Sequence, residues 1–215
     1  MKRHTHYILI IGSFLALTIS ATGQSKKFIK AMKKNIVLLD SANTEKEFLS
    51  CARNFEKMKE KDNWLLNYYT GMSYALAATQ KNEDSIADEY CDVAERFINK
   101  ADSLSPDNSE IYVLKAMLAT SRIMADPMSR WMQYGKKSYD ATQKAMSLDP
   151  SNPRPYVYKG QSAYYTPGNF GGGCEKAKPL METALEKFKI FKPASEIHPN
   201  WGKNDANEII NECNK

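Results

Sequence analysis

The chain has 215 residues, enough for one ordinary domain with its own core. A hydrophobic share of 42% and a charged share of 26% exclude a disordered or collagen-like chain. The formal net charge of +5 is too small to indicate a nucleic-acid or acidic-membrane partner.

The first residues have the pattern of a secretory signal peptide. Lys2 and Arg3 precede an apolar run from Tyr7 to Ile19, and Ala21-Thr22-Gly23 is a small-x-small cleavage site. An N-terminal membrane anchor is the alternative, but the run is short for a spanning helix, which needs ~20 residues. We therefore expect residues 1–23 to be cleaved.

Cleavage defines the expected mature protein. It leaves 24–215 as a single domain with no membrane span, located in the periplasm or secreted. No cysteine lies near the cut, so lipidation there is not expected.

Apolar residues at helical spacing predict an almost entirely helical mature chain, since no stretch shows sustained strand alternation. Thr44 and Glu47 form a capping-box pattern before the second helix. Proline-containing or polar turns separate the later helices. The predicted helices, in order, are 25–40, 44–60, 64–79, 85–104, 109–125, 128–148, 155–165, 174–190 and 203–213.

The connection Thr166–Gly173 is the unusual one, with glycines at 168 and 171–173. It matches neither a Walker motif nor a dinucleotide fingerprint. One interpretation is that its backbone N–H groups bind an anion before the next helix. The other is a tight inter-helix loop in which Phe170 plugs the core.

Two stretches repeat each other at a fixed offset of 44 residues: 101–119 and 145–163. In each, a helix ends on Ala-x-x-Leu, a proline turn follows, and an aromatic residue opens the next helix. Such a period predicts a stacked repeat, whose units bury their apolar faces against their neighbours. The matching pairs are Ala101/Ala145, Ser103/Ser147, Leu104/Leu148, Pro106/Pro150, Asn108/Asn152, Tyr112/Tyr156, Val113/Val157, Lys115/Lys159 and Ala119/Ala163.

The pattern resembles tetratricopeptide repeats. The second-helix frame is met by Ala94, Ile98, Ala101 and Pro106, and the first-helix frame by Tyr112, Ala116, Ala119 and by Tyr156, Gly160, Ala163. The resemblance implies an all-α fold of antiparallel helical hairpins stacked as a short TPR-like right-handed solenoid. The period of 44 exceeds the usual 34, so the helices or connections must be longer and the superhelix curvature cannot be taken from the family.

The sequence contains no motif that supports a catalytic or a metal site. His198 is the only histidine outside the leader, no Gly-x-Ser-x-Gly elbow is present, and no Cys-x-x-Cys pair occurs. We therefore expect no enzyme, no metal site and no cofactor. The four cysteines (51, 91, 174 and 213) allow three disulfide pairings, and small buried hydrophobes are the alternative.

Function is then expected on the surface. The first hypothesis is a non-enzymatic scaffold that binds a protein or peptide on its concave face, lined in such repeats by the first helix of each hairpin. The second is a small-molecule binding protein with its site between the repeats and the loop Thr166–Gly173. The candidate binding residues are Tyr68, Met72, Val113, Met117, Ser121, Arg154, Gln161, Tyr164 and Tyr165, and packing between repeats is the alternative for each.

Overall fold

The computed structural model describes residues 25–81 and 84–215, so the predicted signal peptide, 1–23, lies outside the described residues. Within those ranges the chain is helical and contains no strand, which confirms the all-α prediction. No described helix is long and apolar enough to cross a membrane. The helices are α1 (Lys26–Ser41), α2 (Glu45–Glu56), α3 (Trp64–Thr79), α4 (Asp84–Leu104), α5 (Ser109–Ala125), α6 (Pro127–Leu148), α7 (Arg154–Tyr165), the 3-10 turn η1 (Gly168–Phe170), α8 (Cys174–Ile190) and α9 (Lys203–Cys213).

Local side chains explain where the helices begin. The capping box of Thr44 and Glu47 is present at the start of α2, as the sequence predicts. Asn63, Asn108 and Asn152 recur at intervals of 45 and 44 residues. The side-chain oxygen of each accepts a hydrogen bond from the backbone N–H two residues later, at 2.9, 2.9 and 3.0 Å. Asn63 and Asn108 are thus the N-caps of α3 and α5, and Asn152 lies one residue before Pro153, the N-cap of α7.

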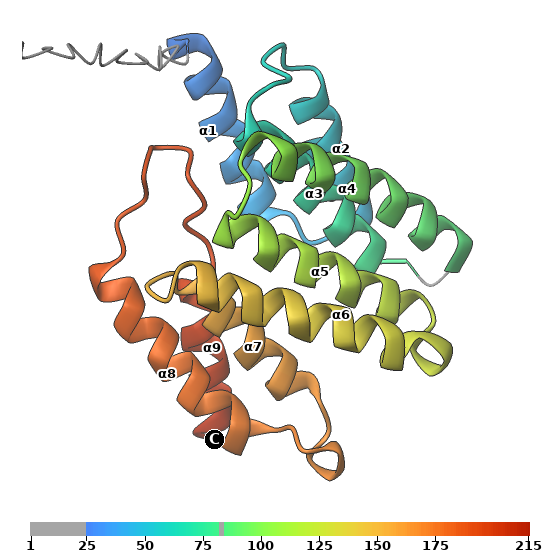
Figure 1. Ribbon diagram of the computed structural model, residues 1–215, viewed down its shortest axis with the longest axis vertical. Helices are drawn as coiled ribbons and strands as arrows, with labels where there is room; N and C mark the ends of the chain where they lie inside the picture. The colour runs from blue at the N-terminus through green and yellow to red at the C-terminus, as the bar shows by residue number, and fades with distance from the viewer. Residues whose placement is uncertain (1–24, 82–83) are drawn as a thin grey trace, which may run out of the picture.

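The helices pack as three consecutive pairs, α3 with α4, α5 with α6, and α7 with α8 (Figure 1). The first helices of the pairs also contact one another, α3 against α5 and α5 against α7. At the N-terminal end α2 packs on α3 and α1 on α2, while α9 packs on α7 and α8. The main core lies among α1 to α5, and a smaller core lies among α7, α8 and α9.

A segment without helical structure, 191–202, connects α8 to α9 and returns to the middle of the molecule (Figure 1). Ile197 is completely buried in the main core. Trp201 donates a hydrogen bond from its indole Nε1 to the hydroxyl of Tyr68 in α3, at 3.0 Å. The segment therefore packs the C-terminal part of the chain against α3 and the main core.

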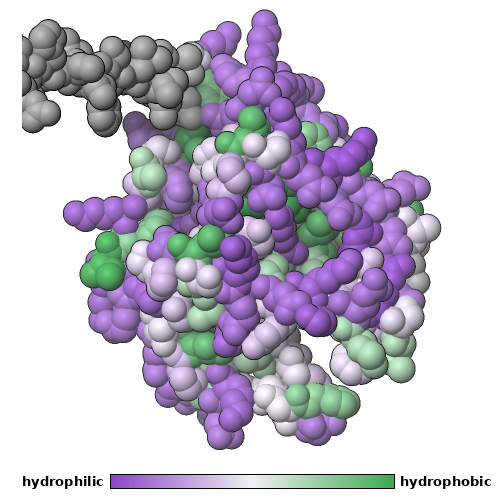
Figure 2. Space-filling model, viewed as in Figure 1, coloured by the Kyte–Doolittle hydropathy of each residue, from purple (hydrophilic) through white to green (hydrophobic). Residues whose placement is uncertain are grey.

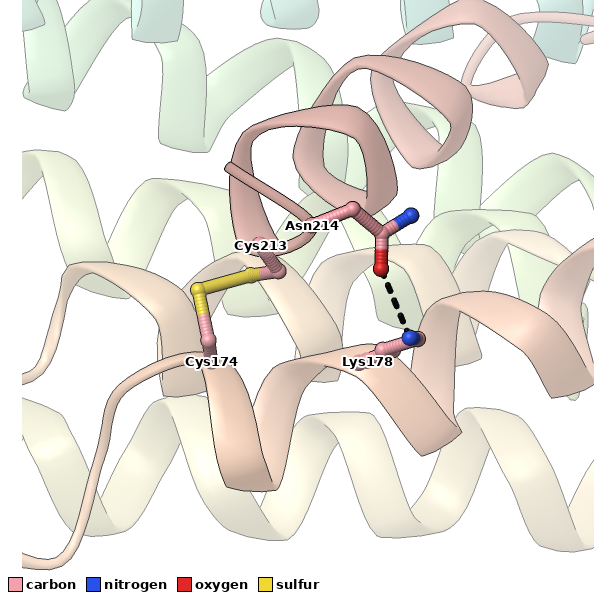
Figure 3. The surroundings of a disulfide bond; sticks show 4 residues. All are labelled: Cys174, Lys178, Cys213 and Asn214. Carbon is pink, nitrogen blue, oxygen red and sulfur yellow. Dashed lines mark hydrogen bonds between the residues drawn. A yellow bond between two sulfur atoms is a disulfide. The ribbon is translucent and has the colours of Figure 1, made fainter.

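One disulfide closes the C-terminal part of the fold. Cys174, the first residue of α8, bonds to Cys213, the last residue of α9 (Figure 3). Beside it Lys178 donates a hydrogen bond to the side-chain oxygen of Asn214 at 2.7 Å. Cys51 and Cys91 are free and buried. The structure thus selects one of the possible disulfides and leaves the other two cysteines as small core residues.

Two glycines at helix crossings give a test of this packing. A Cβ at Gly71 would lie 2.8 Å from Cγ1 of Ile98 and 3.3 Å from the carbonyl oxygen of Ala94, part of the α4 backbone. A Cβ at Gly160 would meet the end of the Met181 side chain at 2.8 Å, and that flexible side chain can move aside.

We expect Gly71→Ala to destabilise the protein by about 1–3 kcal/mol through overpacking. Gly160→Ala should be nearly neutral, because the gain in helix propensity, about 0.5–1 kcal/mol, offsets a small shift of Met181. Urea unfolding of both variants measures the difference. Equal losses would contradict the close approach of α3 to α4.

Candidate functional site

The N-terminal half of α6 is poorly covered by the rest of the fold. Helix α6 has 22 residues, whereas α7, which follows it and runs back along it, has only 12. The ten extra residues correspond to about 15 Å of helix. No residue of the stretch 127–137 is buried, and Ser138 is the first buried residue of α6. The start of α6 therefore extends beyond the end of α7.

Large apolar side chains gather at this end of the molecule. Met128 is 89% exposed on α6, Tyr165 is 76% exposed at the end of α7, and Phe170 is 76% exposed in the loop that follows. In Figure 2 pale green patches lie at the lower right, on both sides of a notch between the start of α6 and the α7–α8 loop. We call the set the apolar end surface: Met124, Met128, Trp131, Met132, Tyr165 and Phe170.

The glycines of the loop direct Phe170 outward. Gly171 and Gly173 adopt φ values of +82° and +92°, which side-chain-bearing residues rarely adopt. The N–H of Gly173 donates to the carbonyl of Ala163 at 2.8 Å, which folds the loop back against the end of α7. The prediction that Phe170 plugs the core is therefore wrong, because the loop closes on its own backbone and leaves the ring in solvent.

The structure divides the nine predicted binding residues into two groups. The first group is buried inside the fold, as the alternative of packing between helices predicts: Tyr68, Met72, Val113, Ser121 and Arg154. Those with exposed or partly exposed side chains are Met117, Gln161, Tyr164 and Tyr165. Tyr165 belongs to the apolar end surface, and the ring of Tyr164 lies 5.1 Å from that of Tyr165 between centroids.

Arg154 shows why part of the predicted set lies inside. Its side chain is completely buried, and its Nε donates to Oε2 of Glu110 at 2.6 Å while its Nη2 contacts Oε1 of the same carboxylate. Asn152 donates a further hydrogen bond to Glu110 at 2.9 Å, and the ring of Phe191 covers the guanidinium at 4.4 Å. A charge held in this way is structural and presents nothing to a partner.

The inner side of the first helices is filled by the chain itself. The imidazole of His198 lies between the rings of Trp64 and Phe191, at centroid distances of 5.9 and 6.2 Å. With Trp201 bonded to Tyr68, the segment 191–202 covers the face where a peptide was expected. In the described ranges no group of three His, Cys, Asp or Glu side chains could hold a metal ion.

Sequence reasoning missed five residues of the apolar end surface: Met128, Trp131, Met132, Phe170 and Met124. The first three have the i, i+3, i+4 spacing of one helix face, a signal present in the sequence. An apolar face with this spacing is normally interpreted as one that is buried against a partner helix. Only the shortness of α7 shows that it is uncovered.

Comparison with known proteins identifies a relative. No protein-family model matches the chain, and no curated protein does. A solved structure, the HusA haemophore from Porphyromonas gingivalis, is 33% identical, with a TM-score of 0.76 over 89% of this chain and 94% of that one. The chain belongs to the family of this haemophore. The similarity is to a binding protein and indicates no enzyme family.

The buried ion pair gives a second prediction. Arg154→Met should cost about 3–5 kcal/mol, because it leaves the Glu110 carboxylate buried without its partner. Adding Glu110→Gln should recover part of that loss, and a double-mutant cycle from urea unfolding measures the coupling. Lys136→Gln, which removes an exposed pair with Asp140, is the control and should change stability by less than about 1 kcal/mol. Additive single losses would contradict the coupling.

His198 gives a pH prediction. Burial lowers the pKa of His198 from its ordinary value of 6.5, an effect opposed by the charge of Glu110. The unfolded chain therefore binds a proton at this residue at a higher pH than the native state does. Stability should fall as pH decreases from 6.5 towards the lowered pKa.

His198→Phe keeps a ring between Trp64 and Phe191 and removes the titration. The unfolding free energy of the variant should therefore depend less on pH in that window than that of the wild type. If the plots of unfolding free energy against pH are parallel for the variant and the wild type, His198 has the same pKa in the native and unfolded states.

Proposed function

We propose that this protein binds haem outside the cytoplasm, and that the apolar end surface is its site. The observation that carries the proposal is the set of exposed apolar side chains from α5, α6, α7 and the following loop. The membership of a haemophore family supports the choice of ligand. Of the two functional hypotheses from the sequence, this favours the small-molecule site next to the loop Thr166–Gly173.

The chemistry of the surface fits a flat apolar ring system. Trp131, Tyr165 and Phe170 offer aromatic faces, and Met128 and Met132 offer flexible, polarizable thioethers. Burial of apolar area contributes roughly 25 cal/mol per Å². Covering these side chains with one ligand therefore stabilises the complex of protein and ligand. Clustered exposed apolar residues are otherwise costly on a protein surface, which is a reason to expect an occupant.

The proposed mode of binding rests on contact with the porphyrin faces. His198, the one histidine in the described part of the chain, is half-buried between two aromatic rings in the segment 191–202. That segment packs at the N-terminal ends of α3 and α7, whereas the apolar end surface lies at the C-terminal ends of α5 and α7 (Figure 1). We therefore assign His198 no role in holding haem.

The wider architecture and location are part of the same proposal. The contacts among α3, α5 and α7, with the recurring asparagine hydrogen bonds, support a TPR-like solenoid. The disulfide between Cys174 and Cys213 supports an oxidising compartment, which agrees with periplasmic location or secretion after signal cleavage. A peptide scaffold acting through the concave face has less support, because the segment 191–202 occupies that side.

Haem titration tests the site. The double variant Trp131→Ala, Phe170→Ala should bind haem at least tenfold more weakly than the wild type, because each lost ring is worth about 1 kcal/mol or more and about 1.4 kcal/mol is tenfold. Soret absorbance measures binding, and the fluorescence of Trp131 in the wild type should be quenched. Ile190→Ala, an equally exposed apolar residue at the far end of α8, is the matched control and should bind normally.

Two results would contradict the proposal. A wild-type protein that shows no saturable change in the Soret band does not bind haem. A double variant that binds as tightly as the wild type removes the apolar end surface as the site and leaves the function to be located elsewhere on the chain.

A further inference from the structure

A second concave surface lies on another face of the repeats, between α4 and α6 and above α5. Its volume is about 470 Å³, within the range of small-molecule sites. Ile98, Leu118 and Ala119 form a buried apolar floor, and charged side chains form the rim. Figure 2 shows this hollow as green atoms within a purple border. The groove shares no lining residue with the apolar end surface.

Four cations of the rim are arranged in two matching groups. Lys115 and Arg122 on α5 are seven residues apart, as are Lys137 and Lys144 on α6. Seven residues are two helical turns, or about 10 Å. Because α5 and α6 are antiparallel, Lys115 lies at the same end of the groove as Lys144, and Arg122 lies at the same end as Lys137.

Each end also has a tyrosine ring between its two cations. The ring centroid of Tyr112 lies 4.3 Å from the ammonium of Lys115 and 5.9 Å from that of Lys144. At the other end the Tyr134 centroid lies 4.8 Å from Lys137 and 6.0 Å from Arg122. The groove therefore has two cationic, aromatic ends joined by an apolar floor.

Acidic neighbours neutralise one of the four cations: Arg122 is only 12% exposed and donates to Asp92 at 2.7 Å and to Glu95, which also lines the groove, at 2.8 Å. Lys115 pairs with Asp102 at 2.8 Å and Lys144 pairs with Asp107 at 3.6 Å, both partly exposed contacts. Such pairs are worth only about 0–1 kcal/mol, so the ammonium groups can turn to a bound anion at low cost. Lys137 has no ion pair with any side chain in the described ranges.

We propose that this groove binds an elongated, apolar molecule that carries an anionic group at each end, about 10 Å apart. The floor of Ile98, Leu118 and Ala119 takes the apolar body. Lys115 and Lys144 take one anion, and Lys137 takes the other, while Arg122 stays paired with Asp92 and Glu95. A tetrapyrrole fits this pattern poorly, because its two propionates leave from one edge of the ring. The site is therefore distinct from the haem site and does not depend on it.

Calorimetric titration with decanedioate tests the groove. Decanedioate should bind saturably and at least tenfold more tightly than butanedioate, which is too short to reach both ends, or decanoate, which has one anion. Binding should weaken as salt is raised, because the contacts are between partly exposed charges.

Two variants and a control locate the ligand. Lys137→Gln with Lys144→Gln removes a cation at each end, and Ala141→Leu fills the groove from α6 without changing its charge. Each should weaken decanedioate binding at least tenfold. Lys34→Gln removes an equal charge from an exposed position of α1, which does not line the groove, and should have no effect.

The remaining outcomes overturn the proposal. No saturable binding of decanedioate, or binding unchanged by the two groove variants, shows that the groove is not such a site. If saturating haem displaces decanedioate and Trp131→Ala, Phe170→Ala weakens both ligands, there is one site only. If haem fails to bind while decanedioate binds through Lys137 and Lys144, the groove stands and the haem function falls.

Discussion

The buried ion pair between Glu110 and Arg154 determines how the hairpins meet. The two residues are 44 apart, so they occupy equivalent positions in consecutive repeats and carry opposite charges. The side-chain nitrogen of Asn152 donates to Glu110, and its side-chain oxygen accepts a hydrogen bond from the backbone N–H of Arg154. One network therefore fixes the start of α7 against the start of α5. A buried ion pair tolerates little displacement, which makes the register of the two helices specific.

The same network explains why the inner side of the hairpins is closed. A guanidinium at the start of α7 requires cover, and Phe191 supplies it from the segment 191–202. Once that segment lies across the first helices, His198 and Trp201 fill the space beside Trp64 and Tyr68. The concave face becomes core. Surfaces for ligands are left where the C-terminal segment does not reach, at the C-terminal ends of α5 and α7 and between α4 and α6.

Much of the fold could be predicted from the sequence because its signals are local. Helical spacing, the Thr44–Glu47 box and the proline turns give all nine described helices within a few residues, and the 44-residue offset identifies α5 and α7 as equivalent. The site could not be predicted in the same way, because exposure is a tertiary property. From the sequence, Arg154 is expected on a binding surface, but it is buried in an ion pair with Glu110. Trp131 has the spacing of a core residue, but it is exposed because α7 is too short to cover it. Of the predicted residues, Tyr165 belongs to the apolar end surface and Tyr164 lies beside it.

The departure from a regular repeat is what creates the candidate haem site. In a regular array each second helix is covered along its length by the next hairpin, as α4 is by α5 of 17 residues. Here α6 keeps its full 22 residues while α7 ends after 12, and the glycine loop that follows turns back on Ala163 instead of continuing the helix. The exposed start of α6 and the loop after α7, which leads to the bond between Cys174 and Cys213, lie at the same end of the molecule (Figure 1). A flat apolar ligand placed there would make the contacts that a longer α7 would have made. The start of α6 can therefore be covered either by additional turns of α7 or by the ligand.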